Sequence, residues 1–177
     1  MTFAAGLSTD ADAERAVNDA MHQIRAAAPN VGGFEVAFVF FSPHHGGDAD
    51  SIAQTLLDQL RLDALIGCSC DGIIGGNQEI EKGPALSILV GRLPGVRVHA
   101  THVGDAQWGD VTDDAGEFVD AFGIGDETRG LIAMGDPWTT PITPFLSACD
   151  RFAPGVPIIG GMSSGARRAG QNVLPVS

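Results

Sequence analysis

A serine motif near the end of the sequence has the form of a hydrolase nucleophile. Residues 161–165 (Gly-Met-Ser-Ser-Gly) follow an apolar run and fit the G-x-S-x-G pattern, which in α/β-hydrolases places a reactive serine on a tight turn. In that class the acid and the histidine of the triad follow the serine along the chain, whereas no Asp, Glu or His follows Ser163. An unassisted hydroxyl is a weak nucleophile. The motif is therefore interpreted as a Gly/Ser loop without a complete triad.

Two cysteines form a second cluster with chemical potential. Cys68 and Cys70 are two residues apart, so on a strand their side chains face the same way. The pair could form a zinc site completed by His44 and His45, or supply a nucleophile with one of these histidines as its base. The commonest role of a free cysteine is that of a small buried hydrophobic residue. We favour this last interpretation and expect no metal, no cofactor and no catalytic residue.

Small polar residues follow several apolar runs that are typical of buried strands. In sheets with parallel strands, ligands bind at the carboxyl ends of the strands, beside helix N-termini. Asp136 could accept an ammonium group there, while backbone amides near Ser8 or Ser163 bind a carboxylate, a pairing that suits an amino acid or a similar small zwitterion. Asp136 could equally cap the next helix or form a turn before it. We expect Ser8, Ser69, Asp136 and Ser163 to converge on one cleft. The full set of residues predicted to bind the ligand is Ser8, Ser42, Cys68, Ser69, Asp136, Gly161, Ser163 and Ser164.

The elements that would position these residues alternate along the chain. Helical spacing of apolar residues predicts helices over residues 13–24, 48–60, 113–122 and 141–152. Short apolar runs predict strands over residues 2–7, 35–42, 64–68, 129–134 and 156–159. Residues 71–82 are rich in turn-formers and predict a loop or a short hairpin. Residues 85–93 and 96–103, joined by Pro94-Gly95, predict an antiparallel pair.

This order predicts one α/β domain over residues 1–177. We expect a layered sandwich around a mixed, mostly parallel β-sheet with one antiparallel strand pair. The strands beginning at residues 35, 64, 129 and 156 are expected at the centre of the sheet because they are almost continuously apolar. Residues 171–176 predict the start of a further strand.

Composition excludes several classes of partner. The chain has 177 residues, 44% of them hydrophobic, and a formal net charge of −12. A chain this acidic repels phosphate groups, so we expect neither nucleic acid nor an anionic membrane as a partner. The longest apolar run, residues 36–41, is far shorter than the roughly 20 residues that span a bilayer, and the N-terminus has no signal-peptide pattern. Together with only three cysteines, these features predict a cytoplasmic protein.

An ordered set of short motifs resembles the N-terminal half of the FIST domain, a sensory domain of signal-transduction proteins. The resemblance covers essentially the whole chain and implies a domain that binds a small ligand, with amino acids as the usual proposal, and passes the signal to an output module. It implies no catalytic residues, and therefore no enzyme. The motifs, in the family's order, are residues 5–9, 41–43, 66–69, 72–73, 81–87, 135–137 and 156–165.

The C-terminal half that follows in the family pattern is absent from this sequence. We therefore expect a stand-alone or truncated protein with an apolar surface patch, and expect its protein partner to be that C-terminal half or an output signalling protein. The predicted function is the sensing of a small ligand. The alternatives are an enzyme that acts on a small molecule through Cys68 or Cys70, and a protein-interaction module that uses the strand at residues 171–176.

Overall fold

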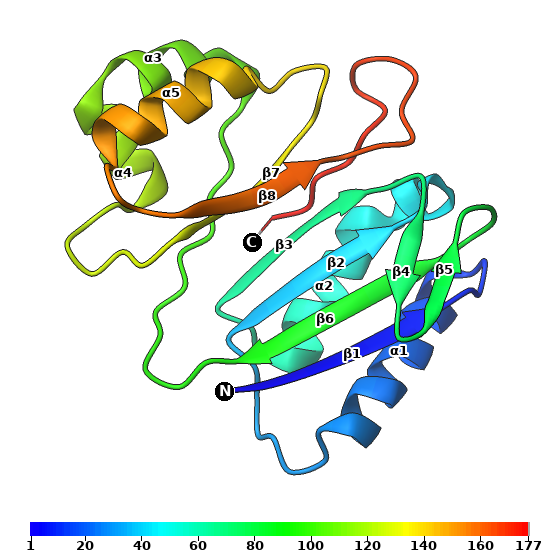
Figure 1. The fold of residues 1–177 in the computed structure, drawn as a ribbon. Coiled ribbons are helices and arrows are strands. Elements are labelled where there is room, and N and C mark those ends of the chain that lie inside the picture. Colours follow the sequence, from blue (N-terminus) through cyan, green and yellow to red (C-terminus); the bar gives the residue numbers. More distant parts are fainter. Residues whose placement is uncertain (177) are drawn as a thin grey trace.

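A mixed four-stranded sheet forms the first layer of the computed structural model, which describes residues 1–176 (Figure 1). Its strands are β1 (Thr2–Ser8), β2 (Val36–Phe41), β3 (Ala64–Ser69) and β6 (Leu86–Arg92), in the order β1-β6-β2-β3. β6 runs antiparallel to both of its neighbours, while β2 and β3 are parallel. The carboxyl ends of β1, β2 and β3 therefore lie along the same edge of the sheet.

Two helices, α1 (Ala13–Ala27) and α2 (Ala49–Leu60), cover one face of this sheet. α1 is capped by Asp12, whose side chain accepts a hydrogen bond from the backbone amide of Arg15. α2 follows a short 3-10 helix, η1 (Pro43–Asp48). The apolar stripes of both helices and alternate residues of the strands meet in one core, which includes Ala4, Ile24, Val39, Leu56 and Ile88.

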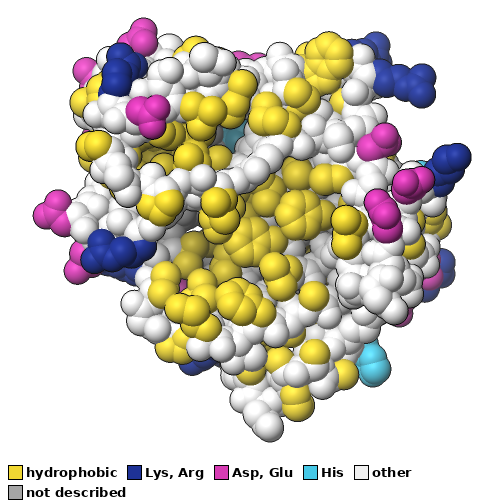
Figure 2. All heavy atoms as spheres, viewed as in Figure 1, with side chains coloured by type: hydrophobic (Ala, Val, Ile, Leu, Met, Phe, Trp, Pro, Cys, Tyr) yellow, Lys and Arg dark blue, Asp and Glu magenta, His cyan; other side chains and the backbone are white. Residues whose placement is uncertain are grey.

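The opposite face of the sheet is exposed over part of β1 and β6. Phe3, Phe38 and Leu89 point to this side, together with Ala5, because they alternate with the core residues of their strands. Phe3 is 55% exposed and Leu89 is 37% exposed. Figure 2 shows hydrophobic side chains gathered over the middle of this view, with few charges among them. We refer to Phe3, Ala5, Phe38 and Leu89 as the open sheet face.

A short hairpin and a second layer complete the fold. The hairpin consists of β4 (Ile73–Gly75) and β5 (Gln78–Ile80). The second layer has its own core, in which the rings of Phe118, Phe122 and Phe145 lie in contact. No helix of the described chain is both long and apolar enough to cross a membrane. The elements of the second layer are the parallel strands β7 (Leu131–Gly135) and β8 (Ile158–Met162), the 3-10 helix η2 (Asp105–Gln107), and the helices α3 (Trp108–Asp113), α4 (Ala115–Phe122) and α5 (Ile142–Phe152).

The α/β class, the mixed sheet and the hairpin within residues 71–82 are confirmed. The predicted antiparallel pairing of residues 85–93 with residues 96–103 is wrong, because no strand forms over residues 96–103. β1 and β2 occupy both edges of β6, so this strand has no free edge for a third partner. Its antiparallel partners come from earlier in the chain.

The predicted place of the strand at residues 64–68 at the centre of the sheet is wrong, because β3 is an edge strand. The same prediction is wrong for residues 129–134 and 156–159. They form β7 and β8, a separate two-stranded sheet in which Ile132 is 48% exposed and Ile159 66% exposed. The four-stranded sheet itself has one parallel and two antiparallel pairings. Residues 171–176 contribute a single bridge, between Val176 and Ile66, along the edge of β3.

Candidate functional site

The residues predicted to bind a ligand fall into two groups in the structure. Ser8 ends β1 at one side of the sheet, whereas Ser69 ends β3 at the other. β6 and β2 lie between these strands, so at the usual strand spacing of about 4.8 Å the two ends are about 14 Å apart. Ser8 therefore does not share a cleft with Asp136 and Ser163, which lie on the side of Ser69.

The second group forms a hydrogen-bonded cluster that we call the junction: Ser69, Asp136, Ser163, Ser164 and Asn172. The Asn172 amide connects two of its members, since its Nδ2 donates to Asp136 Oδ1 (2.9 Å) and its Oδ1 accepts from Ser69 Oγ (3.4 Å). The backbone amide of Ser164 donates to the carbonyl of Ser69 (3.0 Å). The Ser163 hydroxyl is buried without a hydrogen-bond partner in the described chain. The junction thus joins the end of β3 to the second layer.

Asp136 is almost fully enclosed at the junction, with 5% of its surface exposed. Its carboxylate accepts hydrogen bonds from the backbone amide of Trp138 (3.1 Å) and the hydroxyl of Thr139 (3.4 Å), in addition to Asn172. The cap of α5 is Pro141, so Asp136 forms the turn before that helix and does not cap it. The ligand contact proposed for Asp136 from the sequence stays a prediction.

Ser42 and Gly161 are two further members of the predicted set. Ser42 is buried, and its hydroxyl accepts a hydrogen bond from the backbone amide of Ala85 (3.0 Å), which ties the end of β2 to the start of β6. Gly161 lies in β8 opposite Met134 and is exposed. Ser42 follows Phe41, which faces Leu86 of β6, and Leu86 faces Ser8 on its other side, so Ser42 lies two strands from Ser8.

Cys68 and Cys70 lie at the end of β3 with their sulfur atoms 3.5 Å apart. The hydrogen bond from Cys68 lowers the pKa of the Cys70 thiol, and the same contact together with burial raises the pKa of Cys68. His45 is fully buried, and burial lowers its pKa, while His44 Nδ1 lies 3.4 Å from the hydroxyl of Ser42. Within residues 1–176 neither imidazole is hydrogen-bonded to a thiol.

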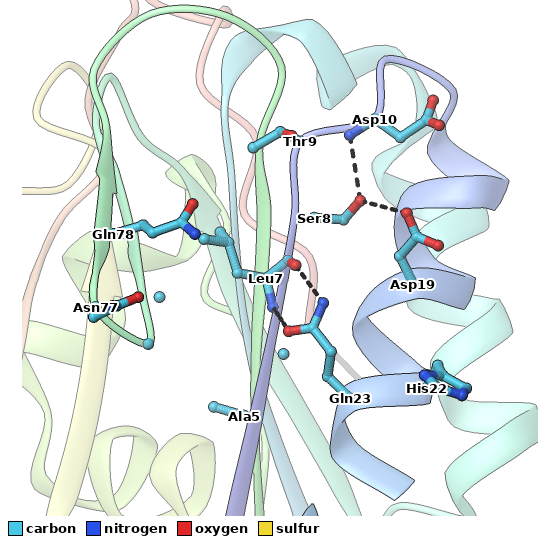
Figure 3. Close-up of a pocket in the computed structure, with 13 residues that line it drawn as sticks. Ala5, Leu7, Ser8, Thr9, Asp10, Asp19, His22, Gln23, Asn77 and Gln78 are labelled. Carbon is cyan, nitrogen blue, oxygen red and sulfur yellow. Dashed lines mark hydrogen bonds between the residues drawn. The ribbon is translucent and has the colours of Figure 1, made fainter. Parts of the chain in front are cut away.

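An open pocket of about 780 Å³ lies at the outer edge of β1 (Figure 3). α1 forms one wall of the pocket and the turn between β4 and β5 forms the other. On the floor, the Gln23 side chain takes the place of a neighbouring strand: Leu7 N–H donates to Gln23 Oε1 (3.0 Å), and Gln23 Nε2 donates to the Leu7 carbonyl (2.7 Å). The backbone groups of Leu7 on the floor of the pocket therefore already have hydrogen-bond partners, and the rim consists of polar side chains.

The rim carries a carboxylate on the α1 side and amides on the hairpin side. The Ser8 hydroxyl donates to Asp19 Oδ2 (3.1 Å) and so orients that carboxylate. The neighbouring Asp10 is already paired with Arg15 (3.0 Å), and the hydrogen bond from Arg15 lowers the pKa of Asp10. Figure 3 shows Asn77 and Gln78 across the pocket from Asp19. The arrangement can hold a ligand that carries a cationic group at one end and a hydrogen-bond acceptor at the other.

Sequence reasoning identified Ser8 but missed the other polar residues of this pocket. Asp19 and Gln23 lie on the polar side of the predicted helix, where such residues are usually ordinary solvated surface. Asn77 lies within residues 71–82, for which the sequence predicts only a loop or a short hairpin. The available signal was the spacing of Asp19 and Gln23, which are four residues apart and so share one side of the helix.

Comparison with known proteins gives one family. The model of the FIST N domain matches residues 35–174. The chain is 26% identical to the uncharacterized protein Mb0898c of Mycobacterium bovis, over 98% of this chain and 43% of the relative. It is 25% identical to the uncharacterized protein MT0656 of Mycobacterium tuberculosis, over 98% of this chain and 44% of the relative. The chain thus spans less than half the length of these relatives, and no solved structure matches it significantly.

Proposed function

This chain belongs to the FIST N domain family, a sensory domain family of signal transduction, and from that premise we propose that it binds a small zwitterion, such as an amino acid, in the pocket between α1 and the β4–β5 turn. Binding is reversible and involves no catalysis. We also propose that the protein is located in the cytoplasm, because its three cysteines are free thiols, as is usual in a reducing compartment.

The size and the charge of the pocket support this proposal. Its volume of about 780 Å³ falls within the range of roughly 300–1,000 Å³ that is typical of small-molecule sites. The Asp19 carboxylate attracts an ammonium group, and the side-chain amides of Asn77 and Gln78 donate hydrogen bonds to a carboxylate. The position of Asp19 across the pocket from these two amides is the observation that carries the proposal.

The pocket also links two elements that a ligand can bring together. Asp19 is held by Ser8, so the α1 side is pre-ordered and the ligand spends little binding energy on orienting it. The opposite side of the pocket is the β4–β5 hairpin, which has three residues in each strand. Its strand β4 lies against β1 and β6. A ligand that contacts both sides restricts the hairpin relative to α1, which supplies the conformational signal that a sensory domain needs.

Asp19→Asn tests the pocket. We expect the substitution to weaken zwitterion binding about 10- to 100-fold, because a hydrogen bond to a charged group contributes about 1.5–3 kcal/mol. A thermal-shift screen of the common amino acids identifies the tightest ligand, and titration calorimetry then measures its Kd with each variant. Glu14→Gln is the matched control, since it removes the same charge from α1 at a residue outside the pocket.

Two outcomes would contradict this proposal in different ways. Equal affinity of Asp19→Asn and the unchanged chain, with loss of affinity in Asp136→Asn, would place the ligand at the junction and leave the sensory function standing. No thermal shift with any amino acid would exclude this class of ligand.

We further propose that the open sheet face binds the C-terminal half of a FIST domain. Exposed apolar patches of this kind mark interaction surfaces, because a sheet is stable in water when both of its apolar faces are covered. The curated relatives have more than half of their length outside the part that matches this chain, which is enough for a second domain. An apolar face with few charges suits a permanent neighbour of the same protein better than a transient partner.

Leu89→Lys tests this face. The part of a mycobacterial relative outside the match, produced as a separate protein, should bind the chain, and Leu89→Lys should weaken that binding by about tenfold or more because it buries a charge among apolar groups. Leu146→Lys on α5 is the control, since Leu146 is 42% exposed and Leu89 is 37% exposed. Sedimentation measures the association. Equal binding by both variants, or association of the chain with itself through this face, would contradict the proposal.

A further inference from the structure

We propose that Cys68 and Cys70 are a peroxide-reactive thiol pair, and that their oxidation to a disulfide releases residues 163–173 from the end of β3. The two sulfur atoms lie 3.5 Å apart, with both cysteines on the same side of the chain at the strand end. The inference rests on this geometry and on the hydrogen bonds of Ser69, and it does not depend on the ligand proposed above.

The two thiols differ in the way that such a reaction needs. Cys70 is partly exposed, whereas Cys68 is buried, so Cys70 is the thiol that meets the oxidant. The hydrogen bond from Cys68 lowers the pKa of Cys70, which favours its reactive thiolate form. Cys149 offers an internal comparison: it is buried, and burial together with Asp150 raises its pKa. Cys149 should therefore not react.

The chemistry balances with hydrogen peroxide as the oxidant. The Cys70 thiolate attacks one peroxide oxygen, the O–O bond breaks, and the departing hydroxide takes a proton to become water, leaving Cys70 as a sulfenic acid. The Cys68 thiol then loses its proton, its sulfur attacks the Cys70 sulfur, and the hydroxyl leaves as a second water. Two thiols are oxidised by two electrons, and one peroxide is reduced to two waters.

The disulfide favours a bend in the strand at the residue between the two cysteines. Two residues of extended strand separate Cα atoms by about 6.7 Å. Disulfides join Cα atoms that are most often about 5.5–6 Å apart, with an upper limit of about 6.8 Å. An extended strand therefore lies at the upper limit for a disulfide, and the bond favours a shorter chain around Ser69.

Ser69 also makes four of the hydrogen bonds that hold residues 163–173 beside the sheet. Its backbone amide donates to the Val173 carbonyl (2.9 Å), and its carbonyl accepts from the Ser164 amide (3.0 Å). Its hydroxyl accepts from the Val173 amide (3.1 Å) and donates to Asn172 Oδ1 (3.4 Å). A bend at Ser69 misaligns these four hydrogen bonds together. The segment that carries Arg167 and Arg168 then keeps fewer contacts, among them the hydrogen bonds from the Asp71 amide to Ser164 Oγ (2.9 Å) and from Asn172 to Asp136 (2.9 Å), and opens more often.

The test combines mass with proteolysis. The reduced chain, treated with a small molar excess of hydrogen peroxide, should lose about 2 Da, with Cys68 and Cys70 both protected from alkylation and the change reversed by a phosphine. Tryptic cleavage after Arg167 and Arg168 should become about tenfold faster in the oxidised chain, because the loss of one net hydrogen bond already changes the population of an open state by about this factor.

Three variants separate the steps. Cys149→Ser should behave as the unchanged chain. Cys68→Ser should stop at a Cys70 sulfenic acid that dimedone traps, and Cys70→Ser should not react; neither should gain tryptic sensitivity. Disulfide-linked dimers, or no mass loss in the unchanged chain, would overturn the thiol pair, and mass loss without faster cleavage would overturn the release of the segment. If Cys68→Ser does not fold, the partly exposed Cys70→Ser variant alone decides the result.

Discussion

Gly6→Ala should lower the free energy of unfolding by about 3 kcal/mol or more, the largest effect that we expect from one added methyl group. A Cβ at residue 6 would overlap the carbonyl group of Ala20 in α1. Because these are backbone atoms and not the end of a flexible side chain, the helix itself has to move away from β1. α1 and β1 also bound the pocket, so the same substitution should separate Asp19 from Ser8 and weaken ligand binding.

Gly109→Ala is the matched control for this prediction. Gly109 lies in α3, and nothing lies within 4 Å of a Cβ added there. Alanine favours a helix over glycine by up to about 1 kcal/mol, so the control should be as stable as the unchanged chain or slightly more stable. Urea denaturation followed by circular dichroism compares the midpoints. A Gly6→Ala midpoint equal to that of the unchanged chain would show that α1 does not pack against β1 at this distance.

Asp136→Ala should lower the free energy of unfolding by about 2–4 kcal/mol. The substitution removes the acceptor of three hydrogen bonds at once and leaves the backbone amide of Trp138, the Thr139 hydroxyl and the Asn172 amide without their partner. The turn before α5 and the link from Asn172 to Ser69 then lose their common anchor. A residue that only contacted a ligand would instead lower the affinity for that ligand and leave the fold intact.

Asp136→Asn separates the effect of the charge from that of the hydrogen bonds, and Asp58→Ala is a control on the surface. Asp136→Asn keeps an oxygen that accepts from Trp138 and Asn172, so it should cost less than half as much stability as Asp136→Ala. Asp58→Ala removes an exposed carboxylate that accepts one hydrogen bond from Gln54 on α2, and it should be almost neutral. If Asp136→Ala and Asp58→Ala have the same denaturation midpoint, the junction does not stabilise the fold.

The sequence by itself determined the local elements of this protein. Apolar spacing over Ala16, Ala20 and Ile24 defines the buried side of α1, and the unbroken apolar run of β2 is typical of a strand within a sheet. The turn-formers at Gly75 and Gly76 predict the hairpin. These features depend on residues that are close together in the sequence, and the spacing of apolar residues there directly indicates which of them are buried. Short motifs, mostly at other positions along the chain, carry the resemblance to the family that the comparison shows.

Only the tertiary structure decided how the strands are ordered and which polar residues meet. Val96 and Val98 alternate with polar residues as a strand would, but β6 is already paired on both edges, and a pattern along one segment does not record whether an edge is free. The insertion of β6 between β1 and β2 likewise separates Ser8 from Ser69. Asp19 enters the pocket because Gly6 lets α1 approach β1 closely, a contact between backbones that leaves no trace in the side chains around Asp19.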